Sequence, residues 1–210
     1  MYSPEPFVAK TSDALDLIHE FPFATCISIT DAGAPFVSHI PLIMETSQDG
    51  SQSLIGHMSR RNPQWTHFER RPSALAIFHG PQAYVSPRWY VSGRDVPTWN
   101  YAVVHVSGRV RLIVDFDGLT EVLKKLTARF ENKRPDPWEF ELPDDLKAPE
   151  ALTRSIVGFE IRMEKVTGKF KVSQNRSLDD QEGVSRGLQE EFGEVGLRLE
   201  HLMHTIKNKE

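Results

Sequence analysis

The chain has 210 residues and a formal net charge of −4, with 39% hydrophobic and 26% charged residues. This length and composition indicate a globular protein, and we find no signal peptide and no window long enough to span a membrane. The lack of any long Lys/Arg block disfavours a broad basic face for nucleic acid and leaves a local basic patch open. A lone Cys26 excludes an internal disulfide, so we expect a cytoplasmic protein.

The N-terminal half predicts two helices and a run of short strands. Thr11-Ser12-Asp13 caps an amphipathic helix that ends near Pro22. A second, short helix is predicted over 63–69, with Asn62 as its N-cap and Pro63 at its first position. Tight turns such as Asp31-Ala32-Gly33-Ala34 and Gly80-Pro81 separate the expected strands, which cover 23–30, 35–44, 53–58, 74–79 and 83–86.

The C-terminal half predicts longer elements. A loop over 87–97 precedes one long strand, 100–114, with Gly108 as a bend or bulge. An amphipathic helix over 115–130 is followed by a Pro- and acid-rich surface excursion, 134–149, and then by extended segments over 156–166 and 168–175. The tail over 177–209 predicts two helices broken around Phe192-Gly193. Several strands joined mostly by tight turns favour an antiparallel barrel or sandwich.

Two segments together suggest a nucleotide-like cofactor. Five of the eight Trp and Tyr residues lie between Tyr84 and Tyr101, and such rings beside polar side chains grip a flat, partly polar ring system. Arg60 and Arg61 immediately precede the predicted start of the second helix, where backbone N–H groups and guanidinium groups bind phosphate. The alternative is a capped surface helix with solvated arginines. The nearby aromatic cluster favours the phosphate interpretation.

Longer stretches resemble the PaiB-like family of FMN-binding proteins, which are usually described as negative transcriptional regulators and are related to pyridoxamine 5'-phosphate oxidases. The resemblance runs from Met1 to about residue 190, although Phe170 stands where the family pattern has Trp. It is carried by the stretches Ser38-His39-Ile40-Pro41, Gly56–Pro63, Pro97-Thr98-Trp99-Asn100-Tyr101 and Lys171-Val172-Ser173-Gln174-Asn175-Arg176. It implies an antiparallel FMN-binding split β-barrel of the pyridoxamine 5'-phosphate oxidase type, mainly β with flanking helices (α+β).

The same resemblance implies how the chain is divided and where FMN binds. The split-barrel domain would cover 1–176, and a helical extension over 177–210 would pack on the same domain. A homodimer would place the cofactor site at its subunit interface. The flavin ring would be lined by Ser38, His39, Ile40 and Pro41, and the ribityl phosphate would be held by His57, Met58, Ser59, Arg60, Arg61 and Asn62. Residues approaching the flavin from the same or a second subunit would be Trp99, Asn100, Lys171, Gln174 and Asn175.

Three functions remain open at this point. The first is an FMN-binding regulatory or sensory protein, and the second is an FMN-dependent oxidoreductase, which needs no catalytic acid or base of its own because hydride chemistry belongs to the cofactor. The third is haem binding or degradation through the strand histidines His39, His57, His79 and His105. No His pair has the spacing of a structural zinc site, so no metal ion is expected.

Two further features bear on partners and reactivity. The C-terminal helices carry many glutamates and no helix-turn-helix signature, which disfavours direct DNA binding. Cys26 lies in an apolar run, where it is either a buried strand residue or a reactive thiol.

Overall fold

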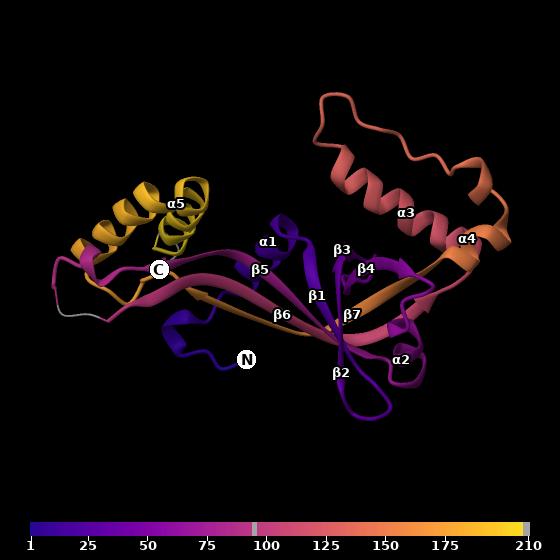
Figure 1. Cartoon of the computed structure of the whole chain (residues 1–210), viewed down its shortest axis with the longest axis horizontal. Helices are drawn as coiled ribbons and strands as arrows, with labels where there is room; N and C mark the ends of the chain where they lie inside the picture. Colours follow the sequence, from indigo (N-terminus) through magenta and orange to yellow (C-terminus); the bar gives the residue numbers. More distant parts are fainter. Residues whose placement is uncertain (94–95, 208–210) are drawn as a thin grey trace. The chain divides into compact units, whose positions relative to one another are not determined.

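The computed structural model describes residues 1–93 and 96–207 (Figure 1). Residues 94 and 95 of the predicted loop, and 208 and 209 of the predicted last helix, lie outside this part. Seven strands form one sheet in the order β2-β1-β5-β6-β7-β4-β3. They are β1 (Phe23–Ile29), β2 (Pro35–Pro41), β3 (Ile43–Thr46), β4 (Gln52–Ser59), β5 (Ser73–Val85), β6 (Thr98–Ile113) and β7 (Ile156–Lys171).

The helices of the described residues agree with most of those expected from the sequence. They are α1 (Thr11–Glu20), α2 (Gln64–Arg70), α3 (Phe116–Glu131), α4 (Pro149–Ser155) and α5 (Leu178–Lys207). The helix α4 was not expected. None of them is long and apolar enough to cross a membrane.

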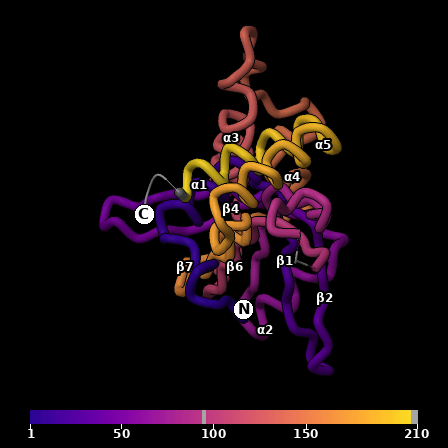
Figure 2. Tube along the Cα trace, turned by 90° about the vertical axis from the view of Figure 1, so that its left-hand side faces the viewer, coloured from indigo at the N-terminus to yellow at the C-terminus, as the bar shows by residue number. Residues whose placement is uncertain are grey.

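The predicted strand 35–44 is in fact two strands. β2 pairs antiparallel with β1, and the two lie side by side in the Cα trace (Figure 2). β3 pairs instead with β4. The chain changes partner at Leu42, whose side chain is fully buried and whose backbone N–H donates to the Pro22 carbonyl at 2.8 Å. Residue patterning alone cannot show this change of partner, because both halves of the segment have strand-forming residues.

The two strands predicted over 74–79 and 83–86, with a turn at Gly80-Pro81 between them, are in fact the single strand β5. The strand runs through both residues. A Cβ at Gly80 would lie 2.9 Å from Leu17 Cδ1 and 3.2 Å from Ala102 Cβ. The glycine therefore allows close approach of neighbouring elements, and it does not mark a turn. Gly108 in β6 has the same role, because a Cβ there would lie 1.9 Å from the Arg162 carbonyl oxygen.

The chain divides into two compact units. The terminal unit comprises Met1–Leu17, His79–Val104 and Thr167–Glu210, and the central unit comprises Ile18–Phe78 and His105–Val166. The long strands β5, β6 and β7 contribute residues to both. The predicted boundary between a split-barrel domain and an extension that begins at 177 stays a prediction, because compactness does not measure independent folding.

The core of the central unit forms where α3 packs on strands. Asp115 caps α3 by accepting the Gly118 N–H at 2.8 Å. The apolar side of α3 then packs against strand residues and α4 in a cluster of buried side chains: Ile43, Ile55, Ile113, Leu119, Val122, Leu126 and Leu152.

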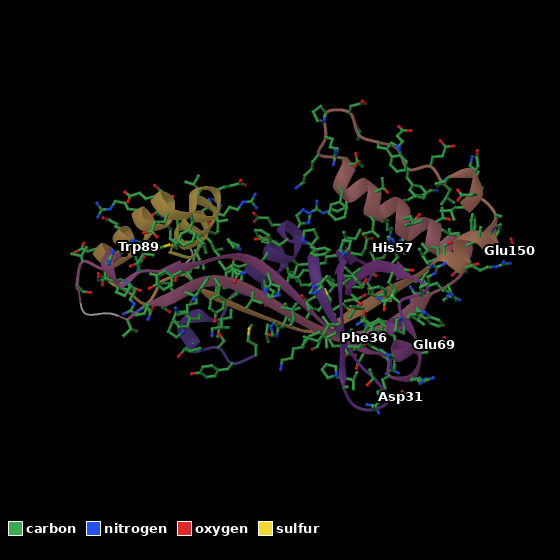
Figure 3. The ribbon with its side chains drawn as sticks, viewed as in Figure 1. Asp31, Phe36, His57, Glu69, Trp89 and Glu150 are labelled. Atoms are coloured by element: carbon green, nitrogen blue, oxygen red, sulfur yellow. The ribbon has the colours of Figure 1, made fainter. Side chains whose placement is uncertain are left out.

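The core of the terminal unit depends on α5. This helix bends at Gly193 (φ 52°, ψ −120°), at the break predicted from the sequence. Its first segment packs on Trp89, labelled in Figure 3, and a Cβ at Gly187 would lie 2.2 Å from the indole ring. The buried cluster that joins α5 to the rest of the unit consists of Ala83, Val85, Tyr90, Val172, Val184, Leu188, Leu199 and Met203.

Candidate cofactor site

The predicted phosphate segment lies where β4 ends and α2 begins, in the central unit. The helix starts one residue later than predicted: Pro63 has helical dihedral angles (φ −68°, ψ −8°) and is the N-cap, and Gln64 is the first helical residue. Asn62 still performs the capping predicted for it, because its Oδ1 accepts the Gln64 N–H at 3.0 Å. The difference of one residue lies within the usual uncertainty of helix ends.

Two hydrogen bonds of the Arg60 backbone hold the turn that carries the two arginines. The Arg60 N–H donates to the Ser155 carbonyl at 2.9 Å, and the Arg60 carbonyl accepts from Trp65 Nε1 at 3.0 Å. The Arg60 guanidinium also lies over the Trp65 ring, 4.9 Å from its centroid. Arg61 is exposed. The fixed backbone orients Arg60 while leaving guanidinium donors available for an anion.

A hydrogen bond joins the predicted phosphate segment to the predicted ring-lining segment. Asn62 Nδ2 donates to Ser38 Oγ on β2 at 2.9 Å. Gly56 adds a second link, since a Cβ there would lie 3.0 Å from the Pro41 carbonyl oxygen. Residues 38–41 and 56–62, far apart in sequence, therefore meet in the central unit.

The four predicted ring-lining residues do not share one face. Strand alternation directs Ser38 and Ile40 to one side of β2 and His39 to the other. Ile40 is buried, whereas His39 is exposed, lies 3.2 Å from Thr25 Oγ1 and stacks with Phe23. A ligand on the Asn62 side would therefore meet Ser38 directly and could meet His39 only through its backbone.

Three buried polar atoms within eight residues have no hydrogen-bond partner among the described residues. They are His57 Nδ1, Arg60 Nη1 and Gln64 Oε1. Burial lowers the pKa of His57, so its ring is neutral at pH 7. A buried polar atom without a partner costs about 1–3 kcal/mol, so each of these atoms is a candidate contact for water or for a polar ligand. Two donors (Arg60 and, in one tautomer, His57) beside the exposed Arg61 suit an anion.

Gln64 was missed in the sequence analysis. Its side chain is fully buried, and Nε2 donates to the Cys26 carbonyl at 3.0 Å and to the Phe36 carbonyl at 3.3 Å. These bonds attach the first turn of α2 to β1 and β2. The available signal was its spacing of four from Phe68, which places a polar residue on the buried side of a short helix. Figure 3 shows His57 on β4 and Phe36 on β2, the strands that supply this site.

The remaining predicted residues belong to the terminal unit and are described by themselves. Lys171 Nζ donates to Thr98 Oγ1 at 2.6 Å and to the Trp99 carbonyl at 2.8 Å. Burial and the nearby cations Arg176 and Lys169 lower the pKa of Lys171. Trp99 is 53% exposed and meets Tyr84 edge-on at 6.2 Å.

These side chains share one side of the sheet. Lys169 Nζ lies 5.5 Å from the centroid of the Tyr101 ring. Lys169 and Lys171 are two residues apart on β7, so their side chains point to the same side of the strand, and the same holds for Trp99 and Tyr101 on β6. We call this set, which consists of Tyr84, Trp99, Tyr101, Lys169 and Lys171, the aromatic–lysine face.

Three residues of this segment make contacts inside the terminal unit: Asn100 and Gln174 through hydrogen bonds, and Phe170 by burial of its ring. Asn100 is fully buried and exchanges hydrogen bonds with Ser173 Oγ at 3.0 and 3.1 Å. The Gln174 amide donates to the carbonyls of Pro6 and Phe170 and accepts the Val172 N–H. Phe170 is buried on the side of β7 opposite the lysines. Asn175 is exposed.

Cys26 is fully buried, and burial raises the pKa of its thiol to about 12, so the interpretation as a buried strand residue is confirmed. Among the described residues, no group of three or more His, Cys, Asp and Glu side chains is arranged to hold a metal ion. His57 and His39 have the surroundings given above.

Fold and site together define a class. An antiparallel α+β sheet protein with an anion-suited turn between a strand and a short helix is typical of flavin-binding split barrels. The chain belongs to the family described as "Putative FMN-binding domain", which matches residues 1–165. This confirms the predicted family and its cofactor, FMN.

The protein is of the PaiB type. It is 34% identical over 213 residues to the "Protease synthase and sporulation protein PAI 2" of Bacillus subtilis, and the match covers the full length of both chains. An uncharacterised protein of Emericella nidulans is 31% identical over 187 residues, covering 72% of this chain and 74% of that protein.

Solved structures confirm the predicted fold class. A FAD and haem binding protein from Mycobacterium smegmatis superposes with a TM-score of 0.57 at 18% identity, covering 82% of this chain and 76% of that one. A conserved hypothetical protein from Mycobacterium tuberculosis gives a TM-score of 0.57 at 13% identity, covering 84% and 94%. At these identities the likeness concerns the fold alone.

Proposed function

We propose that this protein binds FMN with its phosphate in the turn between β4 and α2. The observation that carries the proposal is the pair of buried nitrogen atoms Arg60 Nη1 and His57 Nδ1, which have no hydrogen-bond partner among the described residues. Phosphate oxygens would accept from the guanidinium of Arg60, with exposed Arg61 adding charge at the edge. Ser59 and Asn62 would complete the turn. The flavin ring would lie along β2 on the side of Ser38, where Asn62 already meets it.

We further propose that a second copy of the chain completes the site. In support, β1 and β2 present an apolar outward face that includes Phe23, Ile29 and Val37, which are 63%, 39% and 47% exposed. Exposed apolar side chains gathered on one sheet face are typical of an interface between subunits. Because β2 is the edge strand of the sheet, the partner on its outward face would reach the flavin around this edge, where the partner's Trp99 would pack on the ring and the partner's Lys171 would be its cation.

The role proposed for the bound cofactor is regulatory or sensory, in a cytoplasmic protein of the PaiB type. FMN supplies redox chemistry at its ring, and the protein supplies binding, orientation and exclusion of water. We assign no catalytic acid or base. An oxidoreductase remains distinguishable by experiment, because anaerobic addition of NAD(P)H would bleach bound flavin at a rate that supports turnover. A regulator that contacts DNA itself would give a sequence-selective, salt-dependent gel shift.

The phosphate assignment is tested by titrating apoprotein with FMN and following flavin fluorescence. The variant Arg60→Ala/Arg61→Ala should weaken FMN binding by about 10-fold or more, since a hydrogen bond to a charged group contributes about 1.5–3 kcal/mol. The matched control is Arg70→Ala, which removes an exposed arginine at the end of α2; this arginine pairs with Asp31. Equal losses in the two variants, or no loss in the double variant, would refute the assignment.

The dimer is tested separately by sedimentation. Val37→Glu should dissociate it and lower FMN affinity together, because a charge on the apolar face opposes association. A monomeric wild-type protein that binds FMN at full affinity would remove the partner from the proposal and leave the phosphate assignment intact.

A further inference from the structure

Lys169 on β7 is a half-buried cation that lies close to two tyrosine rings of the terminal unit. Its Nζ is 5.7 Å from the centroid of the Tyr2 ring and 5.5 Å from that of the Tyr101 ring. Within the aromatic–lysine face, the proposal for FMN uses Trp99 and Lys171 and gives no role to Lys169. The surroundings of Lys169 therefore call for an explanation of their own.

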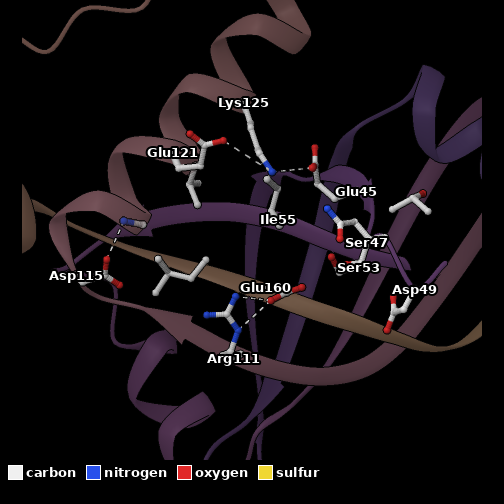
Figure 4. A pocket seen from close by; sticks show the side chains of 15 residues that line it. Glu45, Ser47, Asp49, Ser53, Ile55, Arg111, Asp115, Glu121, Lys125 and Glu160 are labelled. Atoms are coloured by element: carbon white, nitrogen blue, oxygen red, sulfur yellow. Dashed lines mark hydrogen bonds and ion pairs between the residues drawn. The ribbon is translucent and has the colours of Figure 1, made fainter. Parts of the chain in front are cut away.

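Two cations of the central unit show the usual arrangement of a positive charge beside a carboxylate. Lys125 Nζ lies 2.8 Å from Glu45 Oε2, and Arg111 donates through Nε and Nη2 to Glu160 Oε2 at 2.9 and 2.6 Å (Figure 4). Lys169, in contrast, makes no ion pair and no side-chain hydrogen bond with any residue within 1–93 and 96–207. The N–H donors of its ammonium group are thus available to an anion.

Positive charge gathers around Lys169. Lys171 lies two residues further along β7 and donates to two uncharged oxygens, Thr98 Oγ1 and the Trp99 carbonyl. Burial, followed by the nearby cations Arg176 and Lys169, lowers the pKa of Lys171. These cations repel one another, so an anion bound at Lys169 would reduce the repulsion.

Backbone contacts place the Tyr2 ring beside Lys169. Val8 forms a β-bridge with Lys169, and the Ala9 N–H donates to the Gly168 carbonyl at 3.0 Å. The N-terminal segment is therefore attached to β7 where the lysine lies. Tyr2 is 83% exposed, so most of its ring surface is open to a ligand.

We propose that Lys169, Tyr2 and Tyr101 form a binding site for an aromatic carboxylate. The carboxylate would accept hydrogen bonds from the Lys169 ammonium group, and the flat ring would pack against the tyrosine rings. Negative charge suits a cation that has no acidic partner in the described part of the chain. The three residues belong to one chain, so the site needs no partner subunit and is separate from the FMN site.

The test uses NMR on the full-length protein, loaded with FMN and labelled with carbon-13 in its tyrosine rings. The chain has four tyrosines, so Tyr2→Phe and Tyr101→Phe assign the two signals of interest. Benzoate is the probe. Benzyl alcohol is the control that has the ring without the charge, and cyclohexanecarboxylate is the control that has the charge without the aromatic ring.

Benzoate should shift the Tyr2 and Tyr101 signals in a saturable way, whereas the signal of buried Tyr90 should stay constant. Benzoate should bind at least about tenfold tighter than benzyl alcohol, because the alcohol lacks the charge-assisted hydrogen bond. It should bind at least about twofold tighter than cyclohexanecarboxylate, which cannot stack on the tyrosines. Added salt should weaken the binding of benzoate and leave that of benzyl alcohol unchanged.

Variants separate this site from general surface charge. Lys169→Gln should weaken benzoate binding about tenfold, and Lys169→Arg, which keeps the charge, should retain most of it. The matched control is Lys165→Gln, which removes an exposed lysine from the same strand and should change benzoate binding by less than about twofold. Tyr2→Ala removes an exposed ring that is dispensable for folding and should weaken benzoate about threefold.

Flavin absorbance of the same samples distinguishes this proposal from the one for FMN, because Lys169→Gln should keep its FMN while it loses benzoate. Loss of FMN from this variant, or benzoate binding only after FMN is removed, would assign Lys169 to the cofactor and overturn the proposal. Equal binding of benzoate and benzyl alcohol would overturn it as well, as would equal effects of Lys169→Gln and Lys165→Gln.

Discussion

Arg60 and Arg61 are adjacent, yet their surroundings predict different roles, and this difference can be measured. The Arg60 guanidinium lies on Trp65 and has a buried Nη1 without a partner among the described residues, whereas Arg61 is exposed. Arg60→Ala should therefore remove charge-assisted bonds to phosphate worth about 1.5–3 kcal/mol, which raises the Kd for FMN about 10- to 150-fold. Arg61→Ala removes a screened surface charge, so its effect should stay below about fivefold.

The stability of the apoprotein should respond in another way. Arg60→Ala loses a cation–π contact of about 0.5–1 kcal/mol and at the same time removes a buried donor, Nη1, that has no partner among the described residues. These effects oppose each other, so the free energy of unfolding without FMN should change by less than about 1 kcal/mol. The backbone bonds of Arg60 to Ser155 and Trp65 do not involve its guanidinium, so the turn should keep its shape.

The assay is a fluorescence titration of apoprotein with FMN, paired with urea unfolding of each variant without FMN. Arg60→Lys is the matched control: it keeps the charge but lacks the planar fork, so its affinity should fall between those of the wild type and Arg60→Ala. The reasoning fails if Arg61→Ala weakens FMN as much as Arg60→Ala does. It fails equally if Arg60→Ala lowers apoprotein stability by several kcal/mol, since the affinity loss would then reflect a damaged turn.

Three further predictions follow from buried groups. Asn100→Ala and Ser173→Ala should each lower the free energy of unfolding by about 1–3 kcal/mol, because each leaves the other side chain buried without its hydrogen bonds. A double-mutant cycle measured by urea unfolding should show strong coupling between the two positions, and additive losses would contradict the two hydrogen bonds between them. Because burial lowers the pKa of His57, the unfolded chain binds the imidazole proton more tightly than the folded protein does, so the free energy of unfolding should fall as the pH drops below about 6.5. His57→Gln should make the free energy of unfolding less dependent on pH in this range, and an unchanged pH dependence would contradict the prediction. Cys26 should resist a thiol reagent at pH 8 in native protein and react only at the rate of unfolding, whereas rapid labelling of folded protein would disprove its burial.

Much of the local structure follows from short-range signals. The break at Gly193 and the capping role of Asn62 both arise within a few residues of chain, and both were predicted. The two strand predictions that depended on neighbours distant in sequence were wrong. Leu42 ends one strand because β2 and β3 take different partners, and Gly80 continues a strand because Leu17 and Ala102 press against it.

The features of the candidate site also fall into two groups: those carried by local sequence and those that depend on strand pairing. The sequence determined that arginines precede a capped helix, that aromatic rings gather between residues 84 and 101, and that the chain resembles FMN-binding proteins, because charge, ring chemistry and capping are carried by the residues themselves. The contact of Asn62 with Ser38, the burial of Gln64 and the hydrogen bonds between Asn100 and Ser173 became known from the three-dimensional arrangement of the strands. Whether a polar atom has a partner depends on which strands lie beside it, and strand pairing over dozens of residues leaves no trace in local composition.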